Sequence, residues 1–424
     1  MRNRLAQRLT PAGLARRGDV DTGGGQHRTR RFAAHLKPIG VFGRARHTDQ
    51  ASKPAKAESV PWEVVRPAVK VVNLLECHAI RGDHVLMRLL ILGGAWFVGR
   101  ALVEGATSRG WELTTFSRGR SPVPDGVTAV RGDREDAGDL ARLAELAPWD
   151  VVLDVAGAVP TVVRAASRAL RGRVGRYVLM STISVYRDWP YAPVDEQARL
   201  WDGDPDFDPQ TRAWDPDDYG PLKVGCELAA RREFGESVLF IRPTVVLGPH
   251  EYIGRLPWWL GRMARGGRVL APGPSDRRIQ PIDVRDLARF TLDLIAAEVT
   301  GVYNVAAPIG RDTYGDLLES CRLATGSRAE IAWVDKMWLA AQGVAEWTEL
   351  PLWRTLPTAW SMDASRAFAA GLTCRPLRDT VYDTWRWLSS GGRPVEHERS
   401  VEHGIDPVRE ARLLAAWDSR LREG

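Results

Sequence analysis

Residues 87–100 read MRLLILGGAWFVGR and decide the fold of this chain. A short apolar run is followed by a glycine turn and then by a pattern typical of an amphipathic helix. Gly93 and Gly99 suit a turn whose backbone must approach a phosphate group, with a helix N-terminus directed at the anion. The stretch therefore predicts the first strand, turn and helix of a dinucleotide-binding domain.

Trp96 occupies the middle position of this G-x-x-G-x-x-G pattern, where a glycine is usual. Tryptophan adopts a positive φ only with strain, and its ring would crowd a pyrophosphate if it pointed inward. We expect the Trp96 ring to point away from the pyrophosphate or to cover it from outside, while Gly93 and Gly99 provide the close approach.

Apolar runs alternate with helical patterns after this turn. Strands are expected within 111–119, 127–133, 149–157, 175–186 and 237–249, and helices within 97–110, 134–148 and 161–172. This alternation indicates an α/β fold with a Rossmann-type, doubly wound parallel sheet and helices on both faces. Residues 312–390 are mostly helical in pattern and rich in Trp, which predicts a smaller C-terminal substrate lobe over the carboxyl edge of the sheet.

These patterns divide the chain into four parts. They are a basic leader (1–86), a Rossmann domain that binds NAD(P) (87–248), a substrate lobe with strands returning to the sheet (249–390), and a tail with a final amphipathic helix (391–424). The leader is interpreted either as a disordered tail or as sequence upstream of a true start at Met87. A nucleic-acid-binding arm remains a further alternative.

The positive net charge of the chain belongs to the leader. Residues 1–86 contain 16 Lys and Arg against 7 Asp and Glu, so the remaining chain has 43 basic and 46 acidic residues. The body is therefore not a polyanion-binding surface by bulk charge, and we do not expect a nucleic-acid partner for it.

Cysteine and histidine spacing predicts neither a disulfide framework nor a metal site, and no apolar run reaches the roughly 18 residues that a membrane span needs. We therefore expect a cytoplasmic protein. The cysteines are widely separated: Cys77, Cys226, Cys321 and Cys374.

The end of the second strand bears on the choice of cofactor. Residues 114–120 read TTFSRGR and contain no Asp or Glu that would bind the adenosine 2′-hydroxyl of NAD. Arg118 and Arg120 instead offer charged, fork-shaped donors for the 2′-phosphate of NADP. We predict NADP, with NAD as the alternative.

Tyr219 and Lys223 stand four residues apart in a helical pattern, which places them on one helix face. A lysine ammonium there lowers the pKa of the tyrosine by favouring the phenolate, so that Tyr219 can exchange a proton near neutral pH. Upstream, the strand YVLMSTISVY carries hydroxyl groups that could orient a carbonyl or alcohol, at Ser181, Thr182 and Ser184.

The chain resembles the extended short-chain dehydrogenase/reductases of the NAD-dependent epimerase/dehydratase family from Met87 to Leu388. The matching segments are GGAWFVGR, VRGDRED, DVAG, MSTISVY, YGPLKVGCE, IRPTVVLGP, PIDVRDLARF and GVYNVAAP. The resemblance implies an NAD(P)-dependent oxidoreductase or epimerase acting on an alcohol or carbonyl, with a nucleotide sugar as the default substrate. A non-catalytic, NADP- or RNA-binding member of the same fold is the alternative, and a monomer or homodimer is expected.

The resemblance also assigns residues. Its catalytic Thr, Tyr and Lys fall on Thr182, Tyr219 and Lys223. Its cofactor contacts fall on Gly93, Gly94, Phe97, Val98, Gly99, Arg118, Asp133, Ala156, Gly157, Lys223 and Pro243. This chain departs from the family pattern at Trp96 and at Asp154-Val155, where an Asn or His is usual.

Three further residues are candidates for substrate contact. His250 is expected to meet substrate in the second lobe, and Arg277 and Arg278 precede a strand at which relatives hold a nucleotide-sugar pyrophosphate. A dehydratase usually needs an acidic residue beside the catalytic hydroxyl, and this chain has Ile183 there, which favours reduction or epimerisation. The Trp-rich segment 333–360 is interpreted as a hydrophobic lid or core.

Overall fold

The computed structural model describes residues 86–120, 122–213, 215, 218–395, 397 and 403–423. The predictions for the leader, apart from its last residue, lie outside these residues. Among the described residues, no helix combines the length and the apolar character needed to cross a bilayer.

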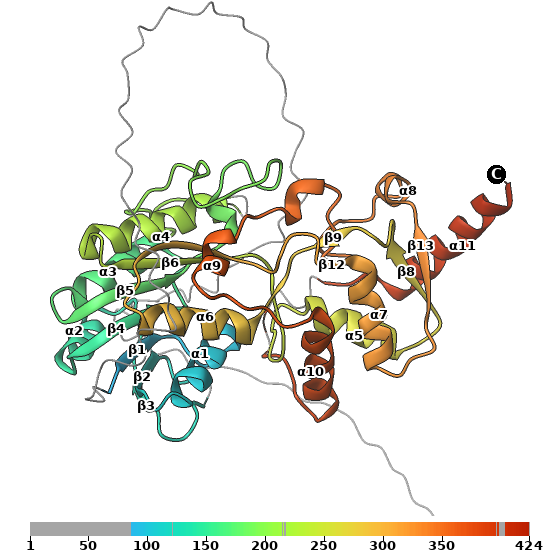
Figure 1. Cartoon of the computed structure of the whole chain (residues 1–424). Coiled ribbons are helices and arrows are strands. Elements are labelled where there is room, and N and C mark those ends of the chain that lie inside the picture. Colours follow the sequence, from blue (N-terminus) through green and yellow to red (C-terminus); the bar gives the residue numbers. More distant parts are fainter. Residues whose placement is uncertain are drawn as a thin grey trace, which may run out of the picture. The chain divides into compact units, whose positions relative to one another are not determined.

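A seven-stranded parallel sheet forms the centre of the fold, in the order β11-β6-β5-β4-β1-β2-β3 (Figure 1). Its strands are β1 (Arg88–Leu92), β2 (Glu112–Ser117), β3 (Thr128–Arg131), β4 (Trp149–Asp154), β5 (Val174–Met180), β6 (Val238–Pro243) and β11 (Gly301–Val305). The strand order reverses between β1 and β4, and ligands of such sheets bind outside the carboxyl ends at this point. The predicted Rossmann-type fold is confirmed.

Helices cover both faces of the sheet because its central strands are apolar on both sides. One face packs on α1 (Phe97–Thr107) and α6 (Val284–Ala296). The other face packs on α2 (Ala137–Glu145), α3 (Pro160–Leu170) and α4 (Tyr219–Phe234). The edge strand β3 differs from the rest, because three of its four residues are exposed and the fourth is half-buried.

Small strand pairs extend from this sheet. They are β7 (Val246–Leu247) with β10 (Ile282–Asp283), β9 (Arg278–Ile279) with β12 (Asp312–Thr313), and β8 (Arg268–Pro272) with β13 (Glu330–Val334). The sequence did not predict the parallel pair β8–β13, because each strand is only five residues long and lies between helical segments.

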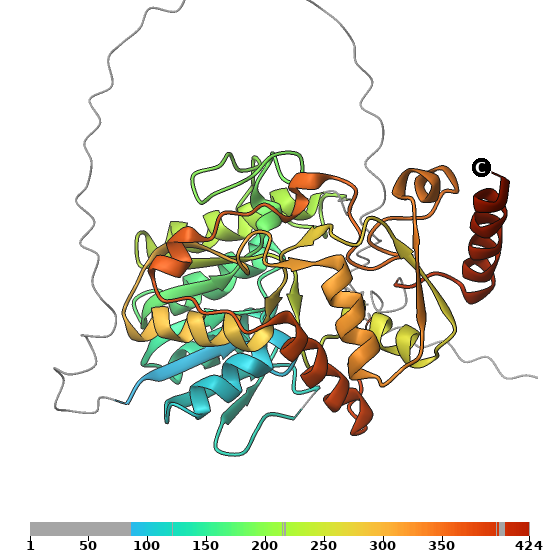
Figure 2. The same ribbon diagram turned by 45° about the vertical axis from the view of Figure 1, so that its right-hand side comes forward.

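A separate hydrophobic cluster lies in the C-terminal half of the chain. It gathers around α5 (Arg255–Ala264), α7 (Tyr314–Ala324), α8 (Lys336–Ala341), α10 (Leu377–Ser389) and α11 (Pro407–Glu423), with the short helix α9 (Ser365–Ala369) nearer the sheet. Figure 2 shows α7 and α10 side by side. Trp353 and Trp360 are buried in this cluster, so the Trp-rich segment 333–360 contributes to the core, as predicted.

Candidate active site

The glycine turn between β1 and α1 has the geometry of a phosphate cradle. Gly93 and Gly94 have φ values of 104° and 97°, which favour glycine strongly. A Cβ atom on Gly99 would stand 2.7 Å from the Gly94 Cα, so the first turn of α1 packs directly against the glycine turn. A side chain at Gly93 would come within 2.8 Å of the Val155 side chain.

The N-terminus of α1 is open to an anion. No side chain caps it, and its first turn contains no acidic residue. Its first backbone N–H groups therefore lack helical acceptors and carry the positive end of the helix dipole. Together with the adjoining glycines, this end of α1 fits the pyrophosphate of a dinucleotide.

Trp96 occupies the N-cap position of α1 without needing a positive φ, because its φ is −121° and its ψ is 145°. Its ring lies 5.8 Å from Tyr252 and 6.3 Å from His397, centroid to centroid. The side chain thus packs among aromatic residues that follow β7 and α10. The strained residue of the turn is Phe97, because its φ of 33° is positive and side chains other than glycine rarely adopt such a value.

The predicted adenosine end of the site lies beyond β2 and β3. Arg118 and Arg120 are exposed, and no ion pair joins either of them to another described residue. Asp133 follows β3, and its carboxylate accepts a hydrogen bond of 3.0 Å from the Glu135 N–H. Its own N–H donates to Asp139 at 2.7 Å. The loop after β3 therefore has a defined conformation, and the two arginines after β2 are exposed where they could meet a phosphate.

Asp154 ends β4 in full burial and is bound by a fork of two hydrogen bonds. Arg134 Nη1 and Nη2 donate to its two carboxylate oxygens at 2.8 and 2.7 Å. The Tyr177 hydroxyl and the Ala156 N–H also donate to it, at 2.7 and 3.0 Å. Burial alone would raise the pKa of Asp154, but the Arg134 charge and these hydrogen bonds outweigh burial and lower the pKa. The residue that replaces the usual Asn or His is therefore a fixed carboxylate.

Lys223 joins the ends of β4 and β5. Its Nζ donates to the carbonyl oxygens of Gly157 at 2.6 Å and Met180 at 2.9 Å, and only 5% of the residue is exposed. Tyr219 is the first residue of α4, one helical turn before Lys223. Its hydroxyl makes no hydrogen bond to any other described residue, so it is free to meet a ligand.

Thr182 lies where β5 passes into a short 3₁₀ turn (Ile183–Val185). Its Oγ1 accepts a hydrogen bond of 3.2 Å from the Ser184 N–H. The N-terminus of α4 packs on this turn, since a side chain at Gly220 would collide with the Ser184 carbonyl oxygen. The fold thus brings the segments that carry Thr182, Tyr219 and Lys223 to the carboxyl edge of the sheet. The remaining predicted cofactor contacts, Val98 and Pro243, lie in α1 and at the end of β6.

A buried polar network behind these residues was missed by sequence reasoning. Glu227 accepts from the Ser181 hydroxyl at 2.6 Å and from Arg242 Nε at 2.9 Å. Arg242 also donates to the Tyr186 hydroxyl at 3.0 Å. Ser181 is therefore engaged, which leaves Thr182 as the less constrained hydroxyl of the strand end. The four-residue spacing of Lys223 and Glu227, which places both on one face of α4, is the sequence signal that could have indicated this network.

Two arginines beyond the sheet, Arg277 and Arg354, form no direct ion pair within the described ranges, although the Glu346 charge acts on both of them. Arg354 is only 9% exposed, and its guanidinium carbon lies 4.5 Å from the Trp347 ring centroid and 5.8 Å from that of Trp189. Its Nε is buried without a hydrogen-bond partner in the described part of the chain. Arg277 is beside it, because its Nη1 donates to the Arg354 carbonyl oxygen. Burial lowers the pKa of both arginines.

The other two substrate candidates differ from Arg277. Arg278 is exposed on β9, and its side chain lies against Gly310. His250 follows β7 with a φ of 69°, and its ring centroid lies 4.6 Å from that of Trp387 in α10. Burial first and the Arg100 charge second lower the pKa of His250. The sequence did not single out Arg354, which is buried and lies beside Arg277, whereas Arg278 is exposed.

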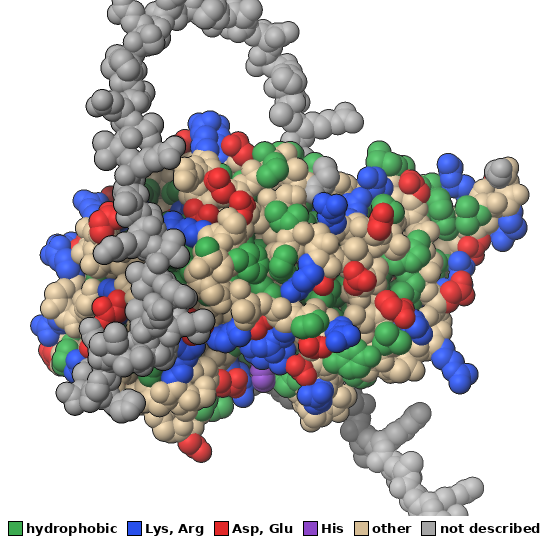
Figure 3. Space-filling view, viewed as in Figure 1, with side chains coloured by type: hydrophobic (Ala, Val, Ile, Leu, Met, Phe, Trp, Pro, Cys, Tyr) green, Lys and Arg blue, Asp and Glu red, His purple; other side chains and the backbone are tan. Residues whose placement is uncertain are grey.

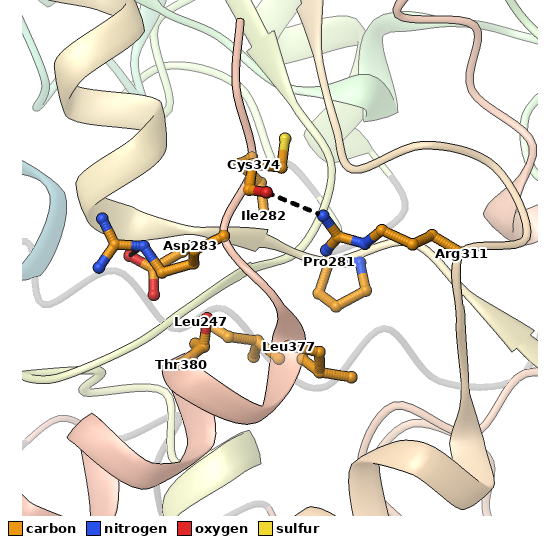
Figure 4. Close-up of a pocket in the computed structure, with 9 residues that line it drawn as sticks. Leu247, Pro281, Ile282, Asp283, Arg311, Cys374, Leu377 and Thr380 are labelled. Carbon is orange, nitrogen blue, oxygen red and sulfur yellow. Dashed lines mark hydrogen bonds and ion pairs between the residues drawn. The ribbon is translucent and has the colours of Figure 1, made fainter.

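A small pocket lies apart from the predicted site residues (Figure 4). Its charged lining groups are already paired: Arg311 with Asp312, Arg375 with Asp286, and Asp283 with Arg285. Arg311 also donates to the Cys374 carbonyl oxygen at 3.2 Å. Burial raises the pKa of the Cys374 thiol to about 11, which suppresses the reactive thiolate. We assign no function to this pocket.

Comparison with solved structures shows the same fold in bacterial enzymes. The crystal structure of the Bordetella bronchiseptica enzyme WbmH in complex with NAD+ has a TM-score of 0.58 and 19% identity, covering 72% of this chain and 100% of that one. The enzyme WbmG of the same organism, in complex with NAD and UDP, has a TM-score of 0.54 and 21% identity, covering 73% and 97%.

A curated relative is the chloroplast stem-loop binding protein of 41 kDa b from Arabidopsis thaliana. It is 24% identical over 256 residues, which cover 56% of this chain and 63% of that protein. The chain thus spans less than two thirds of this relative's length. Residues 89–197 match the sequence model of the NAD dependent epimerase/dehydratase family. These residues carry a domain of that family, which confirms the family predicted from the motifs.

Proposed function

We propose that this chain is a nicotinamide-dependent oxidoreductase or epimerase that acts on an alcohol or carbonyl group. The observation that carries the proposal is the position of Lys223. Its buried ammonium is held between the Gly157 and Met180 carbonyl oxygens, one helical turn from Tyr219, whose hydroxyl has no hydrogen-bond partner among the described residues. The glycine turn and open N-terminus of α1 lie at the same edge of the sheet.

Each residue of this group has a distinct task. Tyr219 takes a proton from an alcohol or returns one to a carbonyl, and the buried Lys223 ammonium lies one helical turn away in α4. The Thr182 hydroxyl orients the reacting oxygen by a hydrogen bond. A bound nicotinamide supplies the hydride acceptor or donor. The two carbonyl oxygens that hold Lys223 fix its position before substrate arrives.

We propose that the cofactor is NADP, with NAD as the alternative. Arg118 and Arg120 support NADP, because both are exposed and a 2′-phosphate would supply the anion that each lacks among the described residues. The complexes of WbmH and WbmG with NAD support the alternative.

The proposed substrate carries a diphosphate, as a nucleotide sugar does. Arg354 and Arg277 are buried or half-buried cations without a direct ion pair in the described part of the chain. The charge of Glu346 acts on both of them, so one carboxylate faces two guanidinium groups, and a ligand anion would compensate the remaining positive charge. A diphosphate offers both the charge and the acceptor oxygens that these guanidinium groups need. The UDP bound by WbmG is a ligand of this chemistry.

Titration of the purified full chain with NADPH and NADH tests the proposal, followed by assays with UDP-sugars. We expect saturable binding of a reduced dinucleotide. We also expect that UDP does not displace the dinucleotide, since the two ligands occupy different parts of the site. A chain that binds neither NADPH nor NADH would contradict the proposal.

A second candidate function is binding of structured RNA without turnover. It is favoured by the similarity to the Arabidopsis thaliana stem-loop binding protein. Against it, Figure 3 shows acidic and basic side chains interspersed over the face in view. Filter binding with residues 87–424 and with the full chain separates the candidates. Strong, salt-sensitive RNA affinity of residues 87–424 would favour the second function.

A further inference from the structure

The loop after β3 has little support from the hydrophobic core. Three of the four β3 residues are exposed, and β3 pairs on only one side because it ends the sheet. Asp133 and Arg134 follow directly after this strand and Gly132. The hydrogen bonds of Asp133 with Asp139 and Glu135 and the close packing of Gly132 on Phe116 support this loop locally, but none of these contacts attaches it to the end of β4.

Arg134 connects this exposed loop to the buried centre of the sheet. Its guanidinium binds Asp154 at the end of β4, although β2 and β1 separate β3 from β4 in the sheet. Only 14% of the Arg134 side chain and none of the Asp154 side chain are exposed. Two parallel hydrogen bonds fix the angle of the guanidinium as well as its distance.

Asp154 in turn is attached to the segment after β4. Its carboxylate accepts the Ala156 N–H, and Gly157 lies so close that a side chain there would meet Asp154 at 3.2 Å. Lys223 donates to the Gly157 carbonyl oxygen. A continuous chain of contacts therefore runs from the loop of Asp133 to the lysine of the proposed catalytic group.

Stability alone does not account for a charged pair at this place. Replacing a buried ion pair by uncharged residues of similar volume is often neutral or stabilising, because the pair must offset the desolvation of both charges. Two parallel hydrogen bonds fix the angle between the loop and the strand. Apolar packing does not fix that angle, so an apolar pair could not replace the ion pair in this respect. The pair therefore suits a positioning task.

We propose that Arg134 and Asp154 form a positioning pair that fixes the Asp133 loop against the end of β4 and thereby sets the affinity of the adenosine half of the dinucleotide site. This inference rests on the proposed function, because it requires a dinucleotide ligand. Arg134 and Asp154 do not themselves touch the ligand. Their effect passes through Asp133 on one side and through Ala156 and Gly157 on the other.

The test removes both charges at once in the full chain, with Arg134→Met and Asp154→Asn. The amide introduced by Asp154→Asn still accepts the Ala156 N–H through its oxygen, and its NH₂ group can donate to the Tyr177 oxygen, so the new side chain keeps both partners. The dissociation constants of NADPH, NADH and ADP-ribose are measured by fluorescence and calorimetry. We expect the constants of all three to rise by about tenfold or more, since each contains the adenosine half.

A matched control exists at the buried pair of Arg262 and Glu410. Arg262 Nε donates to both Glu410 oxygens at 2.9 and 2.8 Å, and Glu410 also accepts the Leu270 N–H. Arg262→Met with Glu410→Gln removes a similarly buried ion pair from the C-terminal cluster. This control is expected to bind the three ligands within about twofold of the wild-type chain.

The outcomes separate the two proposals. If the wild-type chain binds dinucleotide and the Arg134→Met/Asp154→Asn variant binds it equally well, the positioning role is wrong while the proposed function stands. If the wild-type chain binds no dinucleotide, the proposed function fails. If the double variant does not fold, Arg134→Lys provides the measurement. It keeps the charge but not the fork, so weaker ADP-ribose binding supports the role and unchanged binding overturns it.

Discussion

Buried arginines occur in two different settings in this molecule. At the sheet, Arg134 and Arg242 each bind a buried carboxylate, Asp154 and Glu227, through two hydrogen bonds. In the Trp-rich segment, Arg354 is similarly buried but contacts aromatic faces and forms no direct ion pair among the described residues, although the Glu346 charge acts on it.

Arginines with a carboxylate partner stabilise the fold around the site, whereas an arginine without a direct ion pair is available to bind an anionic ligand. A paired guanidinium has its desolvation offset within the protein, so its removal leaves an uncompensated carboxylate. The guanidinium of Arg354 has its desolvation offset only by two aromatic faces and the Glu346 charge, so its removal costs less stability but loses an anion-binding group. Variants at the two places should therefore have opposite effects on stability and binding.

The largest effect is expected at the sheet edge, where the proposed chemistry takes place. Tyr219→Phe should lower turnover by about 10²–10⁴-fold, because it removes the group that exchanges the proton. Dinucleotide affinity should stay within about twofold, since the phenol does not contribute to the proposed phosphate and adenosine contacts. Once a substrate is found in the UDP-sugar assays, steady-state kinetics measure kcat of the wild type and of Tyr219→Phe. Undiminished turnover of the variant would exclude Tyr219 from the reaction.

Breaking a paired arginine should mainly reduce stability. Glu227→Gln leaves Arg242 buried beside a neutral amide and is expected to lower the free energy of unfolding by about 3–5 kcal/mol. Urea denaturation of this variant and of Arg354→Met measures the contrast. A comparable loss of stability in both variants would remove the distinction between paired and unpaired arginines.

Removing the unpaired arginine should mainly reduce binding. Arg354→Met is expected to weaken UDP binding by about 10–100-fold, because hydrogen bonds to charged groups contribute about 1.5–3 kcal/mol. Its unfolding free energy should be unchanged or higher. Arg278→Met is the control, since Arg278 is exposed on the neighbouring strand β9. Equal UDP affinity of wild type and Arg354→Met in calorimetry would place the diphosphate elsewhere.

The paired arginines should also give stability a pH dependence. The pKa of Asp154 is lowered in the folded chain, so its ionised form stabilises the fold above the unfolded pKa of about 3.9. This contribution is lost as the pH falls through the lowered folded pKa. The unfolding free energy of the wild type relative to Arg134→Met/Asp154→Asn should therefore fall below about pH 4. A difference that is constant from about pH 7 to about pH 3 would contradict this account.

The smallest effect concerns cofactor choice. Arg118→Ala should weaken NADPH binding by up to about fivefold, because an exposed charge pair contributes at most about 1 kcal/mol. NADH binding should not change. Fluorescence titrations of the wild type and the variant with NADPH and NADH measure the dissociation constants. An equal change of both constants would argue against a 2′-phosphate contact.

The sequence predicted the features that depend on local pattern. The glycine turn at Gly93, the alternation of apolar strands with helices, and the helical spacing of Tyr219 and Lys223 all follow from neighbouring residues. The final helix α11 was likewise predicted from its amphipathic pattern.

What the sequence did not predict depends on residues far apart in the chain. Asp154 was identified only as a departure from the family pattern, because its partner Arg134 is 20 residues away on a different element. Arg354 stands 77 residues from Arg277, and its lack of a direct ion pair among the described residues is visible only once the chain is folded. The β8–β13 pair was missed for the same reason, since strand pairing across helices leaves no periodic signal.

The most direct test of the account is the binding of a nicotinamide dinucleotide to the purified full chain. Titration with NADPH and NADH, followed by the nicotinamide fluorescence and by calorimetry, should show one saturable site for a reduced dinucleotide. Substitution of Gly93 by valine should abolish that binding, because its φ of 104° and its contact with Val155 exclude a side chain. Absence of saturable binding of either dinucleotide to the wild-type chain would contradict the central claim.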